Sequence, residues 1–278
     1  MLCKTIDIHV DYAAYHLEQD GYQPRLCTYL ASDSTGAEVK RKRPAVIVCP
    51  GGSYRFTSER EAEPVALEFN VRGYQAFVLY YSVAPSRFPC ALYELATAVA
   101  YVRSHAEEWG IDENRILVCG FSAGGHLTAS LGVFWNSDFL KRDLGFTAEH
   151  RPNGLILSYP VISSGPMGHQ ESFENLLGGR LEERRELVSL EKQVNGDVPP
   201  CFLWHTDTDE LVPVENSLLF AMALKAHHLP MELHIYPRGG HGLSLGNEMT
   251  RCERYANEPV VQNWIEMAAR FGMMDFIK

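Results

Sequence analysis

Residues 115–126 read RILVCGFSAGGH, in which an apolar run passes directly into small residues grouped around Ser122. The apolar residues suit a buried strand, and the small ones let the backbone bend where a larger side chain would collide. The stretch contains the motif G-x-S-x-G at 120–124, followed by a segment of helical composition. In this strand–turn–helix setting the motif forms a nucleophile elbow, a sharp turn that exposes a serine above a sheet. The alternative is a glycine-rich turn whose serine has no chemical role.

Strand-like and helix-like segments alternate on either side of this stretch. Strands are expected near residues 5–10, 25–31, 43–52, 76–83, 115–121, 154–162, 199–206 and 231–237. Helices are expected near residues 59–73, 90–110, 123–135, 213–229 and 258–272. This alternation predicts an α/β fold with a mostly parallel central sheet and helices on both faces. Such sheets place their chemistry in loops beyond the carboxyl ends of the strands.

The size of the chain and one polar stretch bear on its domain organisation. The chain has 278 residues, 46% of them hydrophobic, which is enough for one large core. We therefore expect a single domain over residues 1–278. Residues 163–198 break the alternation, because they are polar and charged with only short helical pieces. We interpret them as a small cap inserted over the edge of the sheet.

Two later strand ends supply the partners that a nucleophilic serine needs. A serine hydroxyl requires a histidine to take its proton and a carboxylate to orient that histidine. One strand runs into a loop that contains Asp207 and Asp209, and the next runs into Gly-Gly-His-Gly around His241. With Ser122 these follow the order Ser, Asp, His that the α/β-hydrolase fold uses. Asp209 is favoured because the Val-Pro that follows can anchor its loop, and Asp207 is the alternative.

A glycine-rich loop after an earlier strand is a candidate for the oxyanion hole, the donors that bind the oxygen of the tetrahedral intermediate. Residues 49–54 read CPGGSY, and glycines let bare amides approach that oxygen. The amide of Ala123 begins the predicted helix, whose dipole favours negative charge. We expect donors from Gly52, Gly51 and Ala123, with the amide of Ser53 as a further option. A plain Pro-Gly turn is the alternative.

Other residues near these motifs are expected to have supporting roles. His126 comes one helical turn after Ser122 and is expected to support the elbow. His205 precedes the acid loop and is interpreted as structural, with a place lining the site as the alternative, and His234 is interpreted as a packed side chain within a strand. Tyr54 and the cap are expected to shape the pocket.

Composition and charge disfavour several other classes of function. The formal net charge of −10 disfavours nucleic acid as a partner, since too few cations would oppose the phosphates. The chain has no run of 18 apolar residues, so we expect no membrane span. Its start, MLCKTIDIHVDY, lacks an apolar signal-peptide core, so we expect a cytoplasmic protein. Seven cysteines without a C-x-x-C pair suggest neither a disulfide framework nor a zinc ribbon, and we expect no metal or organic cofactor.

Several motifs together resemble a known family. The stretches PGGSYRFTSEREAEPVA, GFSAGGHL, SYPVISS with SFENLLG, WHTDTDELVPVENSLLFA and GGHGLSL look like those of α/β-hydrolase esterases of the acetylxylan-esterase and acetyl-esterase type. The resemblance spans residues 43–245 and implies the triad named above, with Gly52 and Ala123 at the oxyanion. It also implies a preference for acetylated sugars, which no spacing indicates. The loop reads Pro-Gly-Gly-Ser where relatives of the hormone-sensitive-lipase type carry His-Gly-Gly-Gly, which separates the chain from that branch.

These observations predict a serine carboxylesterase that works through an acyl-enzyme intermediate. The expected substrates are small esters, with acetylated xylo-oligosaccharides or related sugars suggested by the resemblance. A serine peptidase, a thioesterase and a formamidase are alternatives, because the same fold and triad serve them. A non-catalytic hydrolase-like binding protein is a further alternative, which the complete set of triad residues disfavours. The sequence leaves open the acyl chain length, the sugar, the regiochemistry and whether the chain forms a homo-oligomer.

Overall fold

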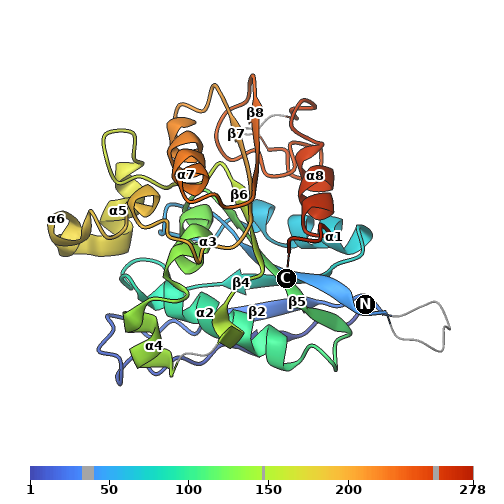
Figure 1. Cartoon of the computed structure of the whole chain (residues 1–278), viewed down its shortest axis with the longest axis horizontal. Coiled ribbons are helices and arrows are strands. Elements are labelled where there is room, and N and C mark those ends of the chain that lie inside the picture. The colour runs from blue at the N-terminus through green and yellow to red at the C-terminus, as the bar shows by residue number, and fades with distance from the viewer. Residues whose placement is uncertain (33–40, 146–147, 253–256, 278) are drawn as a thin grey trace.

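An eight-stranded sheet forms the centre of the structure (Figure 1). The computed structural model describes residues 1–32, 41–145, 148–252 and 257–277. Within these residues the strands lie in the order β1-β2-β4-β3-β5-β6-β7-β8, where β2 pairs antiparallel with both β1 and β4 and all other neighbours pair parallel. The strands are β1 (Thr5–Asp7), β2 (Arg25–Tyr29), β3 (Arg43–Cys49), β4 (Gln75–Tyr80), β5 (Ile111–Phe121), β6 (Gly154–Ser158), β7 (Cys201–Thr206) and β8 (Met231–Tyr236).

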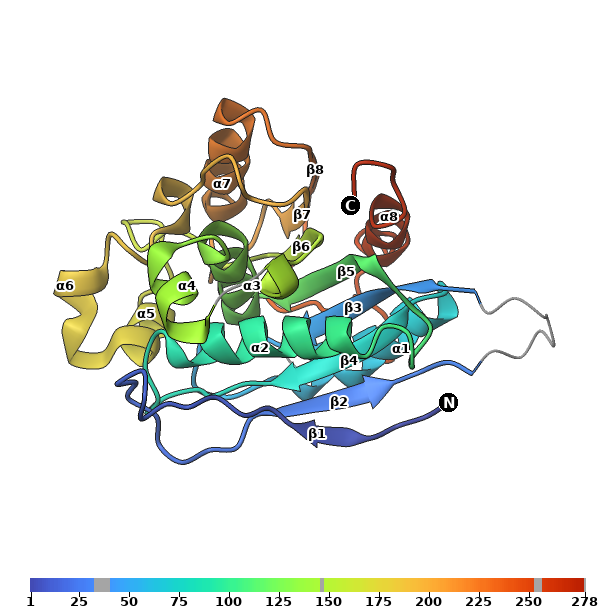
Figure 2. The same ribbon diagram turned by 60° about the horizontal axis from the view of Figure 1, so that its bottom comes forward.

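Helices cover both faces of this sheet, as Figure 2 shows. The helices are α1 (Glu63–Val71), α2 (Cys90–Ser104), α3 (Ala123–Phe134), α4 (Asp138–Leu144), α5 (Gln170–Leu177), α6 (Leu181–Arg184), α7 (Glu215–Ala226) and α8 (Trp264–Phe271), with short 3-10 turns at Glu59–Glu61, Ala148–His150, Gly178–Arg180 and Leu190–Lys192. Helices α2, α3 and α7 share a buried cluster on one face, and α1 and α8 share another on the opposite face. Across the part of the chain that the structure describes, none of the helices has the length and apolar character needed to span a membrane.

The central strands are uninterrupted apolar runs because both of their faces are buried. Every residue of β6 and β7 is buried, which is typical of parallel strands covered on both sides. Neighbouring residues point to opposite faces, so Ile47 packs with the α2 and α3 side whereas Val48 packs with the α1 and α8 side. The predicted α/β class with helices on both faces is confirmed.

Several element boundaries differ from the sequence prediction, and the starts of β5 and α8 are two examples. Strand β5 begins at Ile111 rather than at residue 115, because polar residues of turn-like composition continue the strand. Helix α8 begins at Trp264 rather than at residue 258. The segment before it bonds to another loop instead of to its own helix, since the amide of Glu258 donates to the carbonyl oxygen of Gly246 at 2.8 Å.

The predicted cap falls in the connection between β6 and β7. Residues 163–198 hold α5, α6 and two 3-10 turns, and they lie beside α3 in both views (Figures 1 and 2). Helix α5 is anchored because Phe173, Leu176 and Leu177 are buried in the cluster that α2 and α3 share. The expected single domain over residues 1–278 stays a prediction.

Candidate active site

The backbone at Ser122 turns sharply between the last residue of β5 and the first residue of α3. Ser122 has φ 52° and ψ −118°, a conformation that residues with a side chain rarely adopt. A Cβ on Gly120 would lie 2.2 Å from the carbonyl oxygen of Gly124, and one on Gly124 would lie 2.1 Å from that of Cys49. Glycine is therefore required on both sides of the serine, as a sharp elbow demands.

Three loops at the carboxyl ends of β5, β7 and β8 bring a serine, a histidine and an aspartate together. Nε2 of His241 lies 2.8 Å from Oγ of Ser122, and Nδ1 of His241 lies 2.7 Å from Oδ2 of Asp209. An ionised carboxylate only accepts hydrogen bonds, so Nδ1–H of His241 donates to Asp209. Nε2 is then unprotonated and can accept the hydroxyl proton of Ser122.

The carboxylate of Asp209 is held on both of its oxygens. Oδ1 accepts hydrogen bonds from the amides of Leu211 and Val212 at 3.0 and 2.9 Å. Oδ2 accepts from His241 and also lies 3.3 Å from Nε2 of His205. Burial raises the pKa of the Asp209 carboxyl, but the hydrogen bonds from His205 and His241 outweigh burial and hold the pKa below its usual range. Asp209 is therefore a fixed, ionised acceptor at neutral pH.

Asp207 lies outside this network, whereas His205 belongs to it. The side chain of Asp207 is exposed, and its amide donates to the carbonyl oxygen of Tyr236 at 2.8 Å. His205 is fully buried, and its Nε2 lies 2.9 Å from the carbonyl oxygen of Val212 as well as near Asp209. The interpretation of His205 as structural therefore misses its contact with the acid, since composition alone does not reveal which group a buried ring meets.

The loop after β3 offers backbone amides beside the serine. Gly52 has φ +132°, and a Cβ there would lie 2.1 Å from the carbonyl oxygen of Phe56, so only glycine fits. The amides of Gly52, Ser53 and Ala123 have no hydrogen-bond partner among the described residues. The amide of Gly51 is instead engaged with a buried carboxylate at 2.8 Å. Gly51 therefore does not suit the donor role expected from the sequence, because its N–H is already used.

A cavity of about 480 Å³ opens over these residues. Ser122, His241, Gly52 and Phe56 all line it. The cap reaches its rim through Glu171 of α5, whose Oε1 lies 3.3 Å from a guanidinium nitrogen of Arg55 in the glycine-rich loop. The cavity thus has the serine, the histidine and the Gly52–Ser53 backbone around one space, with a cap residue at its edge.

The sequence matches a described family over more than half of the chain. Residues 35–224 match BD-FAE. The chain belongs to the BD-FAE family. It is 40% identical over 235 residues to endo-1,4-beta-xylanase B of Butyrivibrio fibrisolvens, covering 82% of this chain and 36% of that protein. It is 29% identical over 258 residues to an acetylxylan esterase of Xylanibacter ruminicola, covering 90% of this chain and 49% of that protein.

A solved structure matches this BD-FAE chain along nearly its whole length. The acetyl ester-xyloside bifunctional hydrolase of Caldicellulosiruptor lactoaceticus superposes with a TM-score of 0.83 at 36% identity, covering 99% of this chain and 97% of that one. The α/β-hydrolase fold expected from the resemblance is therefore confirmed. The chain is related to carboxylic ester hydrolases, although it spans only 36% and 49% of the lengths of the two curated relatives.

A buried glutamate beside the elbow, Glu61, is a part of this BD-FAE site to which the sequence motifs assigned no role. Oε2 of Glu61 accepts from the amide of Gly51 at 2.8 Å, and Oε1 accepts from the hydroxyl of Tyr159 at 2.7 Å. That hydroxyl accepts from the amide of Ser244 at 2.9 Å, and the Tyr159 ring packs edge-on against His241. Burial, followed by the charge of Glu61, raises the pKa of Tyr159 well above its usual value. Glu61 thus ties the glycine-rich loop to the loop that carries the histidine.

A buried histidine links the same glycine-rich loop to the cap. Nε2 of His126 lies 2.9 Å from the carbonyl oxygen of Val188, so it donates, and Nδ1 accepts from the hydroxyl of Tyr54 at 2.9 Å. Burial lowers the pKa of His126 to about 4, so the ring is neutral at neutral pH. The side chain of His126 thus connects the glycine-rich loop to the cap, and its expected support of the elbow stays a prediction. Tyr54 is buried and does not line the cavity, so it shapes the pocket only through its loop.

We expect replacement of His126 by phenylalanine to make stability less sensitive to acid. A histidine with a depressed folded-state pKa stabilises the fold fully above its unfolded pKa of about 6.5, and this contribution falls as the pH drops toward the folded value. Between about pH 7.5 and about pH 5, the wild type should lose about 1–2 kcal/mol more of its free energy of unfolding than the variant. Urea denaturation at both pH values measures this. The exposed His9→Asn is the matched control, and parallel pH curves for wild type and His126→Phe would contradict the assignment.

Proposed function

We propose that this chain is a serine carboxylesterase that removes small acyl groups, acetyl above all, from sugar esters. The observation that carries the proposal is the hydrogen-bonded chain from Ser122 through His241 to Asp209, built at three strand ends in a family related to esterases. Each member has the chemical form that its role needs. Asp209 is ionised, the imidazole Nε2 is free to accept a proton, and the serine hydroxyl faces it.

In the first half of the proposed reaction, the enzyme is acylated. Oγ of Ser122 attacks the ester carbonyl carbon while its proton passes to Nε2 of His241. Asp209 stabilises the imidazolium that forms. The amides of Gly52 and Ala123, with Ser53 as a third option, bind the negative oxygen of the tetrahedral intermediate. The intermediate collapses when the C–O bond to the alcohol breaks, and His241 returns the proton to that leaving oxygen.

In the second half, water releases the acyl group. His241 takes a proton from a water molecule, whose oxygen attacks the carbonyl carbon of the acyl-serine. The same amides bind the second oxyanion. When the bond to Ser122 breaks, His241 returns the proton to Oγ, so the carboxylic acid leaves and the enzyme is restored.

The relatives support an acetylated sugar as the substrate class. One is named an acetylxylan esterase and another an acetyl ester-xyloside hydrolase. We extend this to the present chain as acetylated xylo-oligosaccharides or related sugars. The cytoplasmic location expected from the start of the sequence stays a prediction, and with it the expectation that soluble oligosaccharides rather than intact polymer reach the enzyme.

The expected acyl preference can be measured with a series of p-nitrophenyl esters. We expect kcat/KM to fall at least about tenfold from the acetate to the octanoate, because added methylenes must fit a site shaped for a small acyl group. Acetylated xylo-oligosaccharides should release acetate, and a set of dipeptide amides should not be cleaved. A higher kcat/KM for the octanoate than for the acetate, or turnover of the amides at a rate comparable to the acetate, would replace this proposal with a long-chain esterase or a peptidase.

A further inference from the structure

The short turn that precedes α1 is bonded to two separate parts of the proposed catalytic site. Glu61 ends this 3-10 turn (Glu59–Glu61), lines the cavity over Ser122 and is only 4% exposed. Its Oε2 accepts from the amide of Gly51 at 2.8 Å, and its Oε1 accepts from the hydroxyl of Tyr159 at 2.7 Å. A buried carboxylate requires such donors, because little water reaches it. The two oxygens therefore hold two different segments at fixed positions.

The first of these segments determines the direction of the Gly52 amide. The N–H of Gly51 is held by Glu61, and the carbonyl oxygen of Gly51 accepts from the amide of Ser58 at 3.0 Å. That carbonyl and the N–H of Gly52 belong to one planar trans peptide unit, so they point in opposite directions. A Cβ on Gly51 would lie 2.8 Å from Oε2 of Glu61 and 2.9 Å from the Cβ of Ser122, so the loop fits closely between them. Glu61 thus helps to orient an amide that is proposed to bind the oxyanion.

The second segment contacts the catalytic histidine and its loop. The rings of Tyr159 and His241 meet edge to face, with centroids 5.1 Å apart. The hydroxyl of Tyr159 accepts from the amide of Ser244, three residues after His241, at 2.9 Å. Tyr159 is 1% exposed and has φ 37°, a conformation that is rare for a residue with a side chain and that concentrates at functional sites. The tyrosine therefore supports the imidazole with its ring and the histidine loop with its hydroxyl.

Arg60 anchors the same turn independently of Glu61. Nη1 of Arg60 donates to the carbonyl oxygen of Gly242 at 3.0 Å, and Nε donates to that of Thr250 at 2.7 Å. The carbonyl oxygen of Arg60 accepts from the hydroxyl of Ser244 at 2.7 Å. These partners lie 182 to 190 residues further along the chain. A substitution at Glu61 therefore removes its own two hydrogen bonds and leaves the turn attached.

We propose that Glu61 and Tyr159 are positioning residues that act as one unit on the esterase reaction. Through this pair, the amide of Gly52 and the imidazole of His241 keep their places while charge develops on the oxyanion and on the ring. Neither side chain gives or takes a proton in the reaction. This role rests on the proposed function, because both positioned groups belong to its mechanism. Loss of the pair should slow the chemical step and leave binding of the ester nearly unchanged.

Two substitutions of similar shape remove the link from either end. Glu61→Gln leaves one acceptor oxygen for two donors, so one of the two hydrogen bonds is lost. Tyr159→Phe keeps the ring beside His241 and removes the hydroxyl. We expect each variant to lower kcat for p-nitrophenyl acetate about 10–100-fold with KM within about threefold of the wild type. Where Glu61→Gln does not fold, Tyr159→Phe decides alone.

The double variant measures whether the two residues act together. Because coupled residues are not additive, kcat of Glu61→Gln combined with Tyr159→Phe should lie within about threefold of the less active single variant. A loss equal to the product of the two single losses would show independent effects and would refute the single unit.

Glu94→Gln is the matched control for the loss of a buried carboxylate. Glu94 is fully buried and, like Glu61, accepts from one amide and one tyrosine hydroxyl, those of Ser82 and Tyr12. This variant should destabilise the fold as Glu61→Gln does, but it should keep kcat within about threefold of the wild type. Equal losses of kcat in Glu61→Gln and Glu94→Gln would show a general effect of destabilisation and would overturn the inference.

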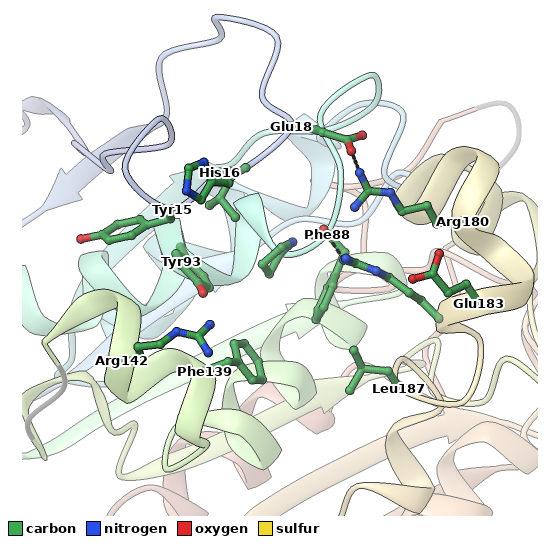
Figure 3. Close-up of a pocket in the computed structure, with 13 residues that line it drawn as sticks. Tyr15, His16, Glu18, Phe88, Tyr93, Phe139, Arg142, Arg180, Glu183 and Leu187 are labelled. Carbon is green, nitrogen blue, oxygen red and sulfur yellow. Dashed lines mark hydrogen bonds and ion pairs between the residues drawn. The ribbon is translucent and has the colours of Figure 1, made fainter.

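Glu183→Gln controls for the change in charge alone. Glu183 is exposed and lines a second cavity, beside the N-terminal segment at 15–18 and α6 (Figure 3). None of the described residues that line this second cavity also lines the cavity over Ser122. The variant should therefore keep both kcat and KM within about threefold of the wild type.

Labelling with a fluorophosphonate separates failure of this inference from failure of the proposed function. The wild type and both single variants should bind one equivalent at Ser122, and the labelling rate constant should fall in the variants together with kcat. Variants that label and turn over within about threefold of the wild type would overturn the inference and leave the esterase proposal intact. A folded wild type that binds no label would overturn the proposed function, and the positioning role with it.

Discussion

Replacement of Ser122 by alanine is expected to lower kcat for p-nitrophenyl acetate by about 10⁴-fold or more, without loss of the fold. The alanine variant has no oxygen to form the acyl-enzyme, and no neighbouring side chain can substitute, because the elbow positions only residue 122 against His241. The residual rate would come from the amide donors and from binding. Alanine keeps the Cβ and the backbone conformation of serine, so we expect the free energy of unfolding to change by less than about 1 kcal/mol.

The matched control is Ser130→Ala, which removes another buried hydroxyl from α3 but none from the reaction. It should retain activity within about threefold of the wild type. A fluorophosphonate probe should label the wild type and Ser130→Ala with one equivalent and should leave Ser122→Ala unlabelled. If Ser122→Ala keeps most of its turnover while it folds normally, a different residue performs the attack.

Local patterns explain why most of the fold could be predicted. The apolar runs of β3, β6 and β7 are buried on both faces, so composition alone marks them as strands. The start of α8 could not be predicted, because Glu258 bonds to Gly246 instead of continuing the helix toward the N-terminus. The order of the strands also depends on contacts between distant segments, such as the pairing of β3 with both β4 and β5.

In the candidate site, too, some residues could be predicted from local sequence patterns and others could not. Ser122 lies in a motif whose neighbours must be small for local steric reasons, so the sequence reveals it. The roles of Glu61 and His205 depend on contacts that only the folded chain creates. Glu61 bonds to Tyr159, which is 98 residues away, and no spacing along the chain encodes that contact. For Gly51 the sequence predicted a role that the structure does not favour. Its N–H could bind an oxyanion, but it already donates to the carboxylate of Glu61.

Replacement of Asp209 by asparagine is expected to lower kcat by about 10³–10⁴-fold, because it reverses the proton positions on His241. In the wild type, Oδ1 accepts from two amides and Oδ2 accepts from His241, so the site needs acceptors on both sides. An asparagine has one acceptor oxygen and one NH₂ group. With the NH₂ toward His241, Nδ1 must accept, so the proton moves to Nε2 and the ring cannot take the proton of Ser122. With the NH₂ toward the amides, three donors face one another and the loop that carries residue 209 is strained.

Asp207→Asn provides the comparison that isolates this effect, since it makes the same chemical change two residues away. The side chain of Asp207 is exposed, so its variant should retain kcat within about threefold and the stability of the wild type. The two variants should also differ in KM much less than in kcat, because the acid orients the histidine and is not expected to touch the ester. A large loss of kcat in Asp207→Asn with little loss in Asp209→Asn would assign the role of the orienting acid to Asp207 instead of Asp209. Comparable activity in both variants would mean that neither carboxylate orients His241 during turnover, and the proposed proton transfer from Ser122 would lose its physical basis.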